Sequence, residues 1–263
     1  MVLTRVKAIL WLHTLRLWRY RWSFLNLVLA EAAWVFLFVL GALLFVPGEY
    51  LGLAVKSAFW TIVAWTIISQ CSSLIGAWMN FFISIGMVEE HILRGISPFK
   101  VILGRVVTSF SVILVSLLFI SAILNGVFKT NVWAINDPYL LTLSFIALAL
   151  QGLAYGITIA AISVKTSIPH NMLEIVNFAV IGLLMIPLDR IPGLFAIPFL
   201  CVPYVASAHL AKIGASGAQP YMLLEALNIS LLETLVMLTI AIYVIKKSEE
   251  WIKKNGVRAI GFF

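Results

Sequence analysis

Residues 106–128 read VVTSFSVILVSLLFISAILNGVF, a run of 23 residues without a charged side chain. A helix of about 20 residues is long enough to cross the ~30 Å hydrocarbon core of a bilayer. The apolar residues run consecutively and do not alternate, so they predict helices and not the strands of a membrane β-barrel. Five further apolar blocks accompany this one, at residues 23–46, 55–83, 139–164, 172–188 and 223–245. We therefore expect an all-α, polytopic integral membrane protein with six transmembrane helices.

The composition agrees with this fold class. The chain is 62% apolar and 11% charged, and its mean hydropathy is +1.07. A soluble globular domain is closer to half apolar and a quarter charged. The apolar blocks are too numerous for a signal peptide followed by a soluble domain. We find no internal repeat and no low-complexity linker, so residues 1–263 are expected to form a single transmembrane domain.

The distribution of positive charge predicts the topology. A net charge of +7 can indicate nucleic-acid binding, but Lys and Arg also collect on the cytoplasmic side of membrane proteins. With six spans, five of the 18 cations lie in the N-terminal segment, three between residues 86 and 105, one at Lys165 and five in the C-terminal tail, all inside. Four lie outside. We therefore expect a multi-pass protein of the cell membrane with both termini cytoplasmic and no nucleic-acid partner.

Two segments do not read as simple spans. In residues 1–22, cations alternate with an apolar stripe at helical spacing, which predicts a helix lying along the inner leaflet. In residues 189–220, the apolar part from Ile191 to Ala208 is interrupted by Pro192, Pro198 and Pro203, which argue against one straight helix. A seventh span here would place the five-cation tail outside, so we predict one or two short re-entrant helices dipping in from the extracellular side. Such backbone is tolerated where it lines a cavity, which makes this segment a functional candidate.

Motifs for catalysis and cofactor binding are missing. The sequence has no phosphate-binding G-x-x-x-x-G-K-[ST] string, no H-E-x-x-H and no Cys/His cluster with metal-ligand spacing. An intramembrane enzyme would need a nucleophile–base pair, and we find none. No cofactor, metal or catalytic residue is therefore expected in this chain, which is not expected to be an enzyme by itself.

The segment between the second and third apolar blocks reads GMVEEHILRGISPFKVILGR, residues 86–105. Glu90 and Arg94 are four residues apart, in the order that favours a helical ion pair. Gly95 predicts the end of a first short helix, from Val88 to Arg94. Ser97 as N-cap and Pro98 at the first helical position predict the start of a second. The result is a compact knob that carries acidic and basic side chains.

This order of features resembles the cytoplasmic loop of ABC type-2 permeases, the membrane subunits of ATP-driven exporters. The wider layout is also similar: an interfacial first helix, six spans, a helical knob after the second span and re-entrant helices before the last. The resemblance implies that two subunits pair, either two copies of this chain or one copy with a homologous permease. It further implies that a separate ATPase subunit, which binds ATP and Mg²⁺, meets the coupling residues Glu89, Glu90, His91 and Arg94.

Acidic residues within spans suggest an alternative function. Glu233 lies near the middle of the last apolar block, and Glu225 lies two helical turns before it. Intramembrane acids mark a functional site or a partner. Glu233 has two interpretations, a structural hydrogen bond to another helix or a role in a transport pathway. The alternative is therefore a secondary transporter or channel that uses Glu233 and Glu225 as proton or ion sites. Five polar residues of the second block are expected to form interhelical hydrogen bonds: Ser69, Gln70, Ser72, Ser73 and Asn80.

Overall fold

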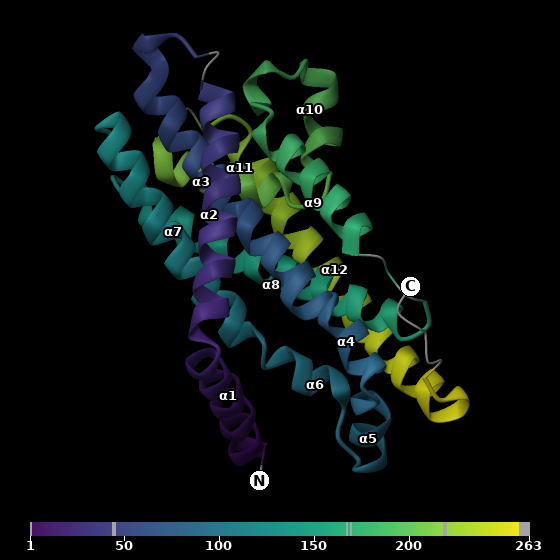
Figure 1. Ribbon diagram of the computed structural model, residues 1–263. Coiled ribbons are helices and arrows are strands. Elements are labelled where there is room, and N and C mark those ends of the chain that lie inside the picture. The colour runs from purple at the N-terminus through teal and green to yellow at the C-terminus, as the bar shows by residue number, and fades with distance from the viewer. Residues whose placement is uncertain (1, 44–45, 167, 169, 218–219, 258–263) are drawn as a thin grey trace.

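The computed structural model describes residues 2–43, 46–166, 168, 170–217 and 220–257 (Figure 1). Over these residues the chain is helical and contains no strand. The helices are α1 Val2–Arg19, α2 Arg21–Leu43, α3 Leu51–Cys71, α4 Trp78–Ser84, α5 Met87–Leu93, α6 Pro98–Leu103, α7 Val106–Phe128, α8 Pro138–Ser163, α9 His170–Met185, α10 Gly193–Leu200, α11 Val205–Ser216 and α12 Leu223–Asn255. Short 3₁₀ turns at Gly48–Tyr50 and Leu188–Arg190 and a π turn at Ser72–Gly76 join some of them.

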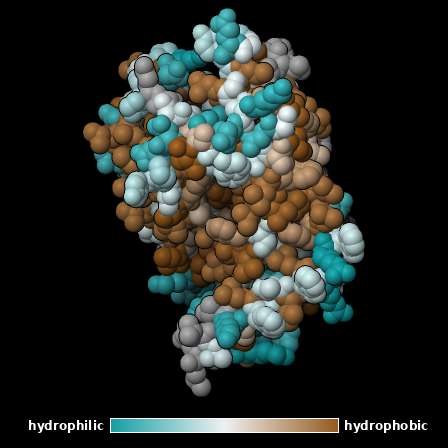
Figure 2. All heavy atoms as spheres, turned by 90° about the vertical axis from the view of Figure 1, so that its left-hand side faces the viewer, coloured by the Kyte–Doolittle hydropathy of each residue, from teal (hydrophilic) through white to brown (hydrophobic). Residues whose placement is uncertain are grey.

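Several helices are long and apolar enough to cross a membrane. Within the described part of the chain these are four continuous helical stretches, Gly48–Ser84, Pro98–Phe128, Pro138–Ser163 and Leu223–Asn255. A fifth is possible if the bent pair α10–α11 counts as one span, and α9 is a shorter apolar helix. The side of the molecule on which α7 lies carries a broad apolar zone, and the two ends of that side are more polar (Figure 2). The expected all-helical, membrane-compatible fold is thus confirmed at this level.

Helix α8 lies at the centre because its small residues allow close backbone approach. A Cβ atom on Gly156 would lie 2.4 Å from the Cys71 carbonyl oxygen, and one on Gly152 would lie 3.3 Å from the Cys71 Sγ. Gly152 and Gly156 form a G-x-x-x-G pattern, which brings membrane helices together by packing. The contact falls where α3 widens into the π turn Ser72–Gly76, and such turns interrupt regular helices. The second apolar block is therefore held closely against α8 at Cys71.

The apolar stretch 191–208 forms two helices and not one. Helices α10 and α11 meet at a bend of 105°. Pro192 precedes the first residue of α10, Pro198 lies inside that helix, and Pro203 lies in the turn that follows it. Tyr204 begins α11 from a left-handed backbone conformation, with φ +73°. The segment is thus not one straight helix, as the prolines predict, and Pro192, Pro198 and Pro203 lie before, inside and after the first of its two short helices. Its re-entrant path from the outer side stays a prediction.

Helix α12 is longer than the apolar block that predicted it. It runs for 33 residues and ends at Asn255, ten residues beyond the expected span end at Ile245. At 1.5 Å per residue it is about 50 Å long, which exceeds the ~30 Å apolar core of a bilayer. Its last turns carry Lys246, Lys247, Lys253 and Lys254. The segment expected to be a basic tail is therefore largely a helical extension, which reaches the end of the molecule that carries α5 and α6.

Candidate functional site

The segment 86–105 folds as the predicted pair of short helices. Helix α5, Met87–Leu93, lies between two glycines with left-handed backbone, Gly86 at φ +72° and Gly95 at φ +68°. Glycine adopts this conformation without steric cost, so both turns are encoded directly. Helix α6 begins at Pro98 with Ser97 as its N-cap residue. The predicted boundaries are confirmed to within one residue.

The knob is anchored on its apolar side. Val88, Phe99 and Ile102 are at most 1% exposed and belong to one buried cluster with Phe82 of α4 and Ile252 of α12. Full burial of side chains of this size contributes about 1.5–3 kcal/mol each. The α5–α6 pair is therefore a rigid part of the fold and not a loosely attached loop.

The four predicted coupling residues do not share one orientation. Glu89, Glu90 and Arg94 are exposed, and Arg94 Nη2 lies 2.5 Å from Glu90 Oε1. An exposed pair at this spacing contributes only about 0.3–0.5 kcal/mol to stability. The pair is of interest because it is accessible to a partner, and not because it stabilises the fold. His91 is half-buried, and its ring lies 5.9 Å from the ring of Phe82. Three charged groups of the predicted set are thus exposed and the histidine packs against α4, and the coupling role of all four stays a prediction.

The C-terminal turns of α12 hold the knob by polar contacts at two places. The Ser97 hydroxyl donates to the carboxylate of Glu249. Its oxygen accepts no backbone N–H of α6, so the predicted N-cap occupies its position without the usual capping bond. The Val257 N–H donates to Glu89 Oε1 at 3.2 Å. A polar cavity of about 230 Å³ lies between the two elements, lined by residues that include Ile96, Lys100 and Lys253. We did not predict this contact from the sequence. A signal for it was present, because Ser248 and Ile252 are four residues apart among charged residues and so lie on one face of a helix.

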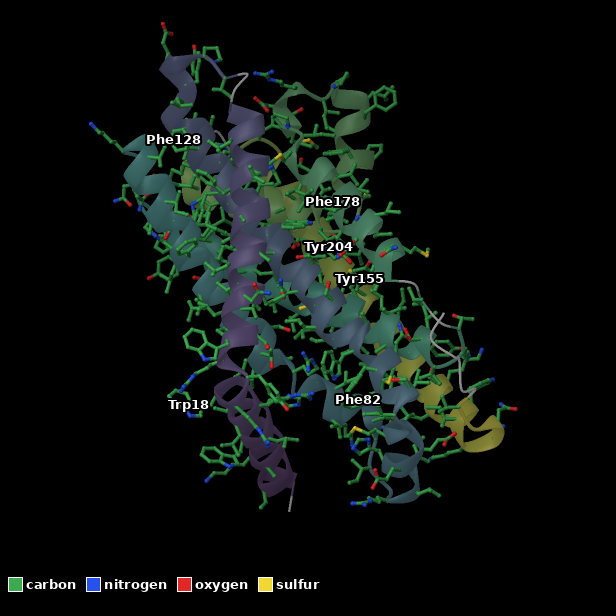
Figure 3. The ribbon with its side chains drawn as sticks, in the orientation of Figure 1. Trp18, Phe82, Phe128, Tyr155, Phe178 and Tyr204 are labelled. Atoms are coloured by element: carbon green, nitrogen blue, oxygen red, sulfur yellow. The ribbon has the colours of Figure 1, made fainter. Side chains whose placement is uncertain are left out.

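Glu233 lies at the second candidate site, where α12 meets α11. Its Oε1 accepts the backbone N–H of Tyr204 at 2.6 Å, so the carboxylate lies at the N-terminus of α11, where negative charge is favoured. Its Oε2 is buried and has no hydrogen-bond partner among the described residues. The rings of Tyr204 and Tyr155 lie 6.0 Å apart near the middle of the molecule (Figure 3). Of the two interpretations of Glu233, the structural hydrogen bond to another helix is present, and the pathway role stays a prediction.

Glu225 is not brought to the same place. It lies exposed in the first turn of α12, two turns before Glu233. The two acids are therefore about 12 Å apart along the helix axis, and a role of Glu225 as a proton or ion site stays a prediction.

A buried polar network lies next to Glu233 and was not predicted. Gln151 of α8 is fully buried, and its Nε2 donates to the Thr234 hydroxyl at 3.0 Å. The Ser207 hydroxyl of α11 donates to Gln151 Oε1 at 3.1 Å and lies 2.7 Å from the Ser230 hydroxyl. Both ends of the amide are thus satisfied, as a buried amide requires. The network joins α8, α11 and α12, and the signal for it was a glutamine in the middle of the apolar block 139–164.

The polar residues of the second block have mixed outcomes. Ser72 exchanges hydrogen bonds with Asn177 of α9, with Asn177 Nδ2 to Ser72 Oγ at 3.0 Å. Asn80 Nδ2 donates to the Ile168 carbonyl at 3.1 Å, which also joins distant segments. The Gln70 side-chain oxygen is buried and finds no partner in the described part of the chain. Interhelical bonding is therefore confirmed for Ser72, whereas Asn80 bonds to the loop between α8 and α9.

Neither site has the ligands of a metal centre. Among the described residues no group of three His, Cys, Asp or Glu side chains could hold a metal ion. No protein-family model, no curated protein and no solved structure matches this chain.

Proposed function

We propose that this chain is the membrane subunit of an ATP-driven ABC exporter of the type-2 permease class. It would form the translocation pathway as a dimer, with a second copy of itself or with a homologous permease, and would be coupled to a separate ATPase subunit that binds ATP and Mg²⁺. The observation that carries the proposal is the α5–α6 knob: its charged face is exposed, and its apolar face is fixed to α4 and to the end of α12. A docking element needs both properties, because it must be accessible to a partner and must pass force into the helices.

In this proposal six helices cross the cell membrane, namely α2, α3 with α4, α7, α8, α9 and α12. The α10–α11 pair dips in from the outer side as a re-entrant element, and α1 lies along the inner leaflet. The positive-inside rule supports this arrangement, because it places both termini, α1, α5–α6 and the end of α12 in the cytoplasm. A partner ATPase would then meet Glu89, Glu90 and Arg94.

The proposal predicts that the exposed pair is needed for the ATPase contact. We would replace Glu90 and Arg94 by Ala together, leaving Glu89 because its carboxylate holds the Val257 N–H. The amount of ATPase that copurifies from the native source is expected to fall about five- to tenfold, since losing one or two important interface side chains costs about 1–1.4 kcal/mol. Transport is expected to fall with it.

The matched control is Glu250→Ala, which removes an exposed acid from the end of α12 without touching the knob. It should leave both readouts unchanged. Full ATPase recovery and full transport in the Glu90→Ala/Arg94→Ala variant would show that the coupling assignment is wrong.

A secondary transporter or channel is the second candidate, and the unpartnered Glu233 Oε2 favours it. A carboxylate within a membrane helix can carry protons if it is reached from both sides. Transport by the purified chain with no ATPase present would support this candidate over the first.

A further inference from the structure

An apolar pocket of about 350 Å³ opens on the side of the molecule between α3, α7 and α8. Its lining includes Val63, Ile67, Ile113, Leu114, Leu117 and Leu153. Along α7 it extends from Val106 to Leu117, a rise of about 16 Å, which is close to half of a ~30 Å bilayer core. The pocket therefore has the depth of the acyl region of one leaflet.

The far end of the pocket is closed by aromatic rings. The ring of Trp60 lies 5.7 Å from that of Trp133 and 5.6 Å from that of Phe145, and all three residues line the pocket. The opposite end begins at Val106, directly after Arg105. One end is thus apolar and closed by rings, and the other begins at the residue that follows Arg105 in the chain.

Two guanidinium groups lie against one indole ring at this charged end. The Arg105 guanidinium is 3.6 Å from the Trp78 ring centroid, and its Nε donates to the Leu74 carbonyl at 2.6 Å. The Arg16 guanidinium, from α1, is 5.1 Å from the same centroid. Arg105 is only 5% exposed, whereas Arg16 is exposed. Two like charges this close repel one another, so the arrangement favours an added anion.

Among the residues whose side chains the structure describes, neither Arg16 nor Arg105 forms an ion pair. The neighbouring His13 is 3% exposed, and burial together with the charge of Arg105 lowers its pKa, so the ring is neutral at pH 7. The described side chains therefore do not balance the positive charge of Arg16 and Arg105.

A polar side chain of the pocket lining also lacks a hydrogen-bond partner among the described residues. Ser109 lies one helical turn after Arg105, is 2% exposed and lines the pocket. Its hydroxyl has no hydrogen-bond partner among the described residues. A buried hydroxyl without a partner is unfavourable, so a ligand with an acceptor at this depth would satisfy it.

From this combination we infer that the chain binds one phospholipid with an anionic headgroup at this place. The phosphate lies at Arg16 and Arg105, an ester oxygen accepts from Ser109, and one acyl chain fills the pocket toward Trp60 and Trp133. Arginine pairs with phosphate through several N–H groups, and basic pockets between membrane helices bind anionic lipid headgroups. The inference requires a membrane-embedded chain but does not depend on an ATPase.

The test uses the full-length protein in phosphatidylcholine vesicles with a small fraction of photoactivatable phosphatidylglycerol, whose reactive group is in the acyl chain. Crosslinked residues are mapped by mass spectrometry. Labelling is expected within residues 106–117 and the facing part of α3. A phosphatidylcholine probe with the same acyl chain should label these residues about fivefold less, which is the effect of about one cation–anion contact at a membrane surface.

Two variants and their control locate the headgroup and the chain separately. Arg16→Gln is expected to lower phosphatidylglycerol labelling about fivefold. Arg19→Gln, on the same helix and exposed, should not change it. Ala149→Phe adds a ring to a residue that lines the pocket and should remove the 106–117 labels. Equal labelling by the two lipids in the wild-type protein, or unchanged labelling in the Ala149→Phe variant, would overturn the inference.

Inorganic phosphate distinguishes the source of the anion. At the lipid site, added phosphate should compete weakly, because it lacks the acyl chain that occupies the pocket. Complete displacement of the photoactivatable lipid by phosphate alone would assign Arg16 and Arg105 to a free phosphate ion and would contradict the lipid assignment.

Discussion

Glu233 has a structural role that can be separated from a role in transport. Its carboxylate satisfies the N–H of Tyr204, a residue in the left-handed conformation at the bend between α10 and α11. A glutamine can accept the same hydrogen bond but cannot ionise, whereas a leucine can do neither. The two substitutions therefore test different properties of one position.

We expect Glu233→Gln to keep the melting temperature and the transport rate of the wild type, because coupling to an ATPase does not require ionisation of this group. Glu233→Leu should lower stability by about 1–3 kcal/mol, since the buried Tyr204 N–H loses its acceptor. Thermal unfolding in detergent and transport in vesicles give the two readouts. A stable Glu233→Gln variant without transport would instead favour the proton- or ion-driven alternative.

At the scale of elements, the contact between α3 and α8 depends on glycine residues, which have no side chain to keep the two backbones apart. Gly156→Ala would place a methyl group 2.4 Å from the Cys71 carbonyl oxygen, and a backbone atom cannot rotate away. We expect the free energy of unfolding to fall by about 1–3 kcal/mol, as in other overpacked sites. Gly126→Ala in α7, where nothing lies within 4 Å, is the control and should be neutral or stabilising. Equal melting temperatures for the two variants would contradict the close packing.

The elements differ in how far the sequence predicts them. Helix α7 has the predicted bounds, because an uncharged run between Arg105 and Lys129 leaves little choice. The α10–α11 bend follows from three prolines, and α5 from two flanking glycines. The partners of Gln151, Ser72 and Glu249 could not be predicted, since they lie on segments 56 to 152 residues away and depend on how the helices pack. The G-x-x-x-G pattern of α8 was readable but gives no partner helix by itself.

At the scale of the whole molecule, α12 connects the two candidate sites. Its Glu233 meets the α10–α11 bend, and its Ile252 is 4% exposed within the cluster that anchors α5 and α6. Ile252→Ala is expected to destabilise this end by about 2–5 kcal/mol, because truncation leaves a cavity. Hydrogen exchange should then accelerate in residues 87–103 but not in α10 or α11. Lys254→Ala, an exposed neighbour, serves as the control and should leave exchange in residues 87–103 as it is.

The 33 residues of α12 contain neither proline nor glycine, so the helix has no built-in hinge. Glu233 and Glu249 are sixteen positions apart, which is about 24 Å along the axis of this stiff helix. A shift of α12 along its axis therefore moves both ends by the same distance, unless a helix hydrogen bond breaks. Such a shift would therefore strain two hydrogen bonds together, the one from the Tyr204 N–H to Glu233 and the one from Ser97 to Glu249.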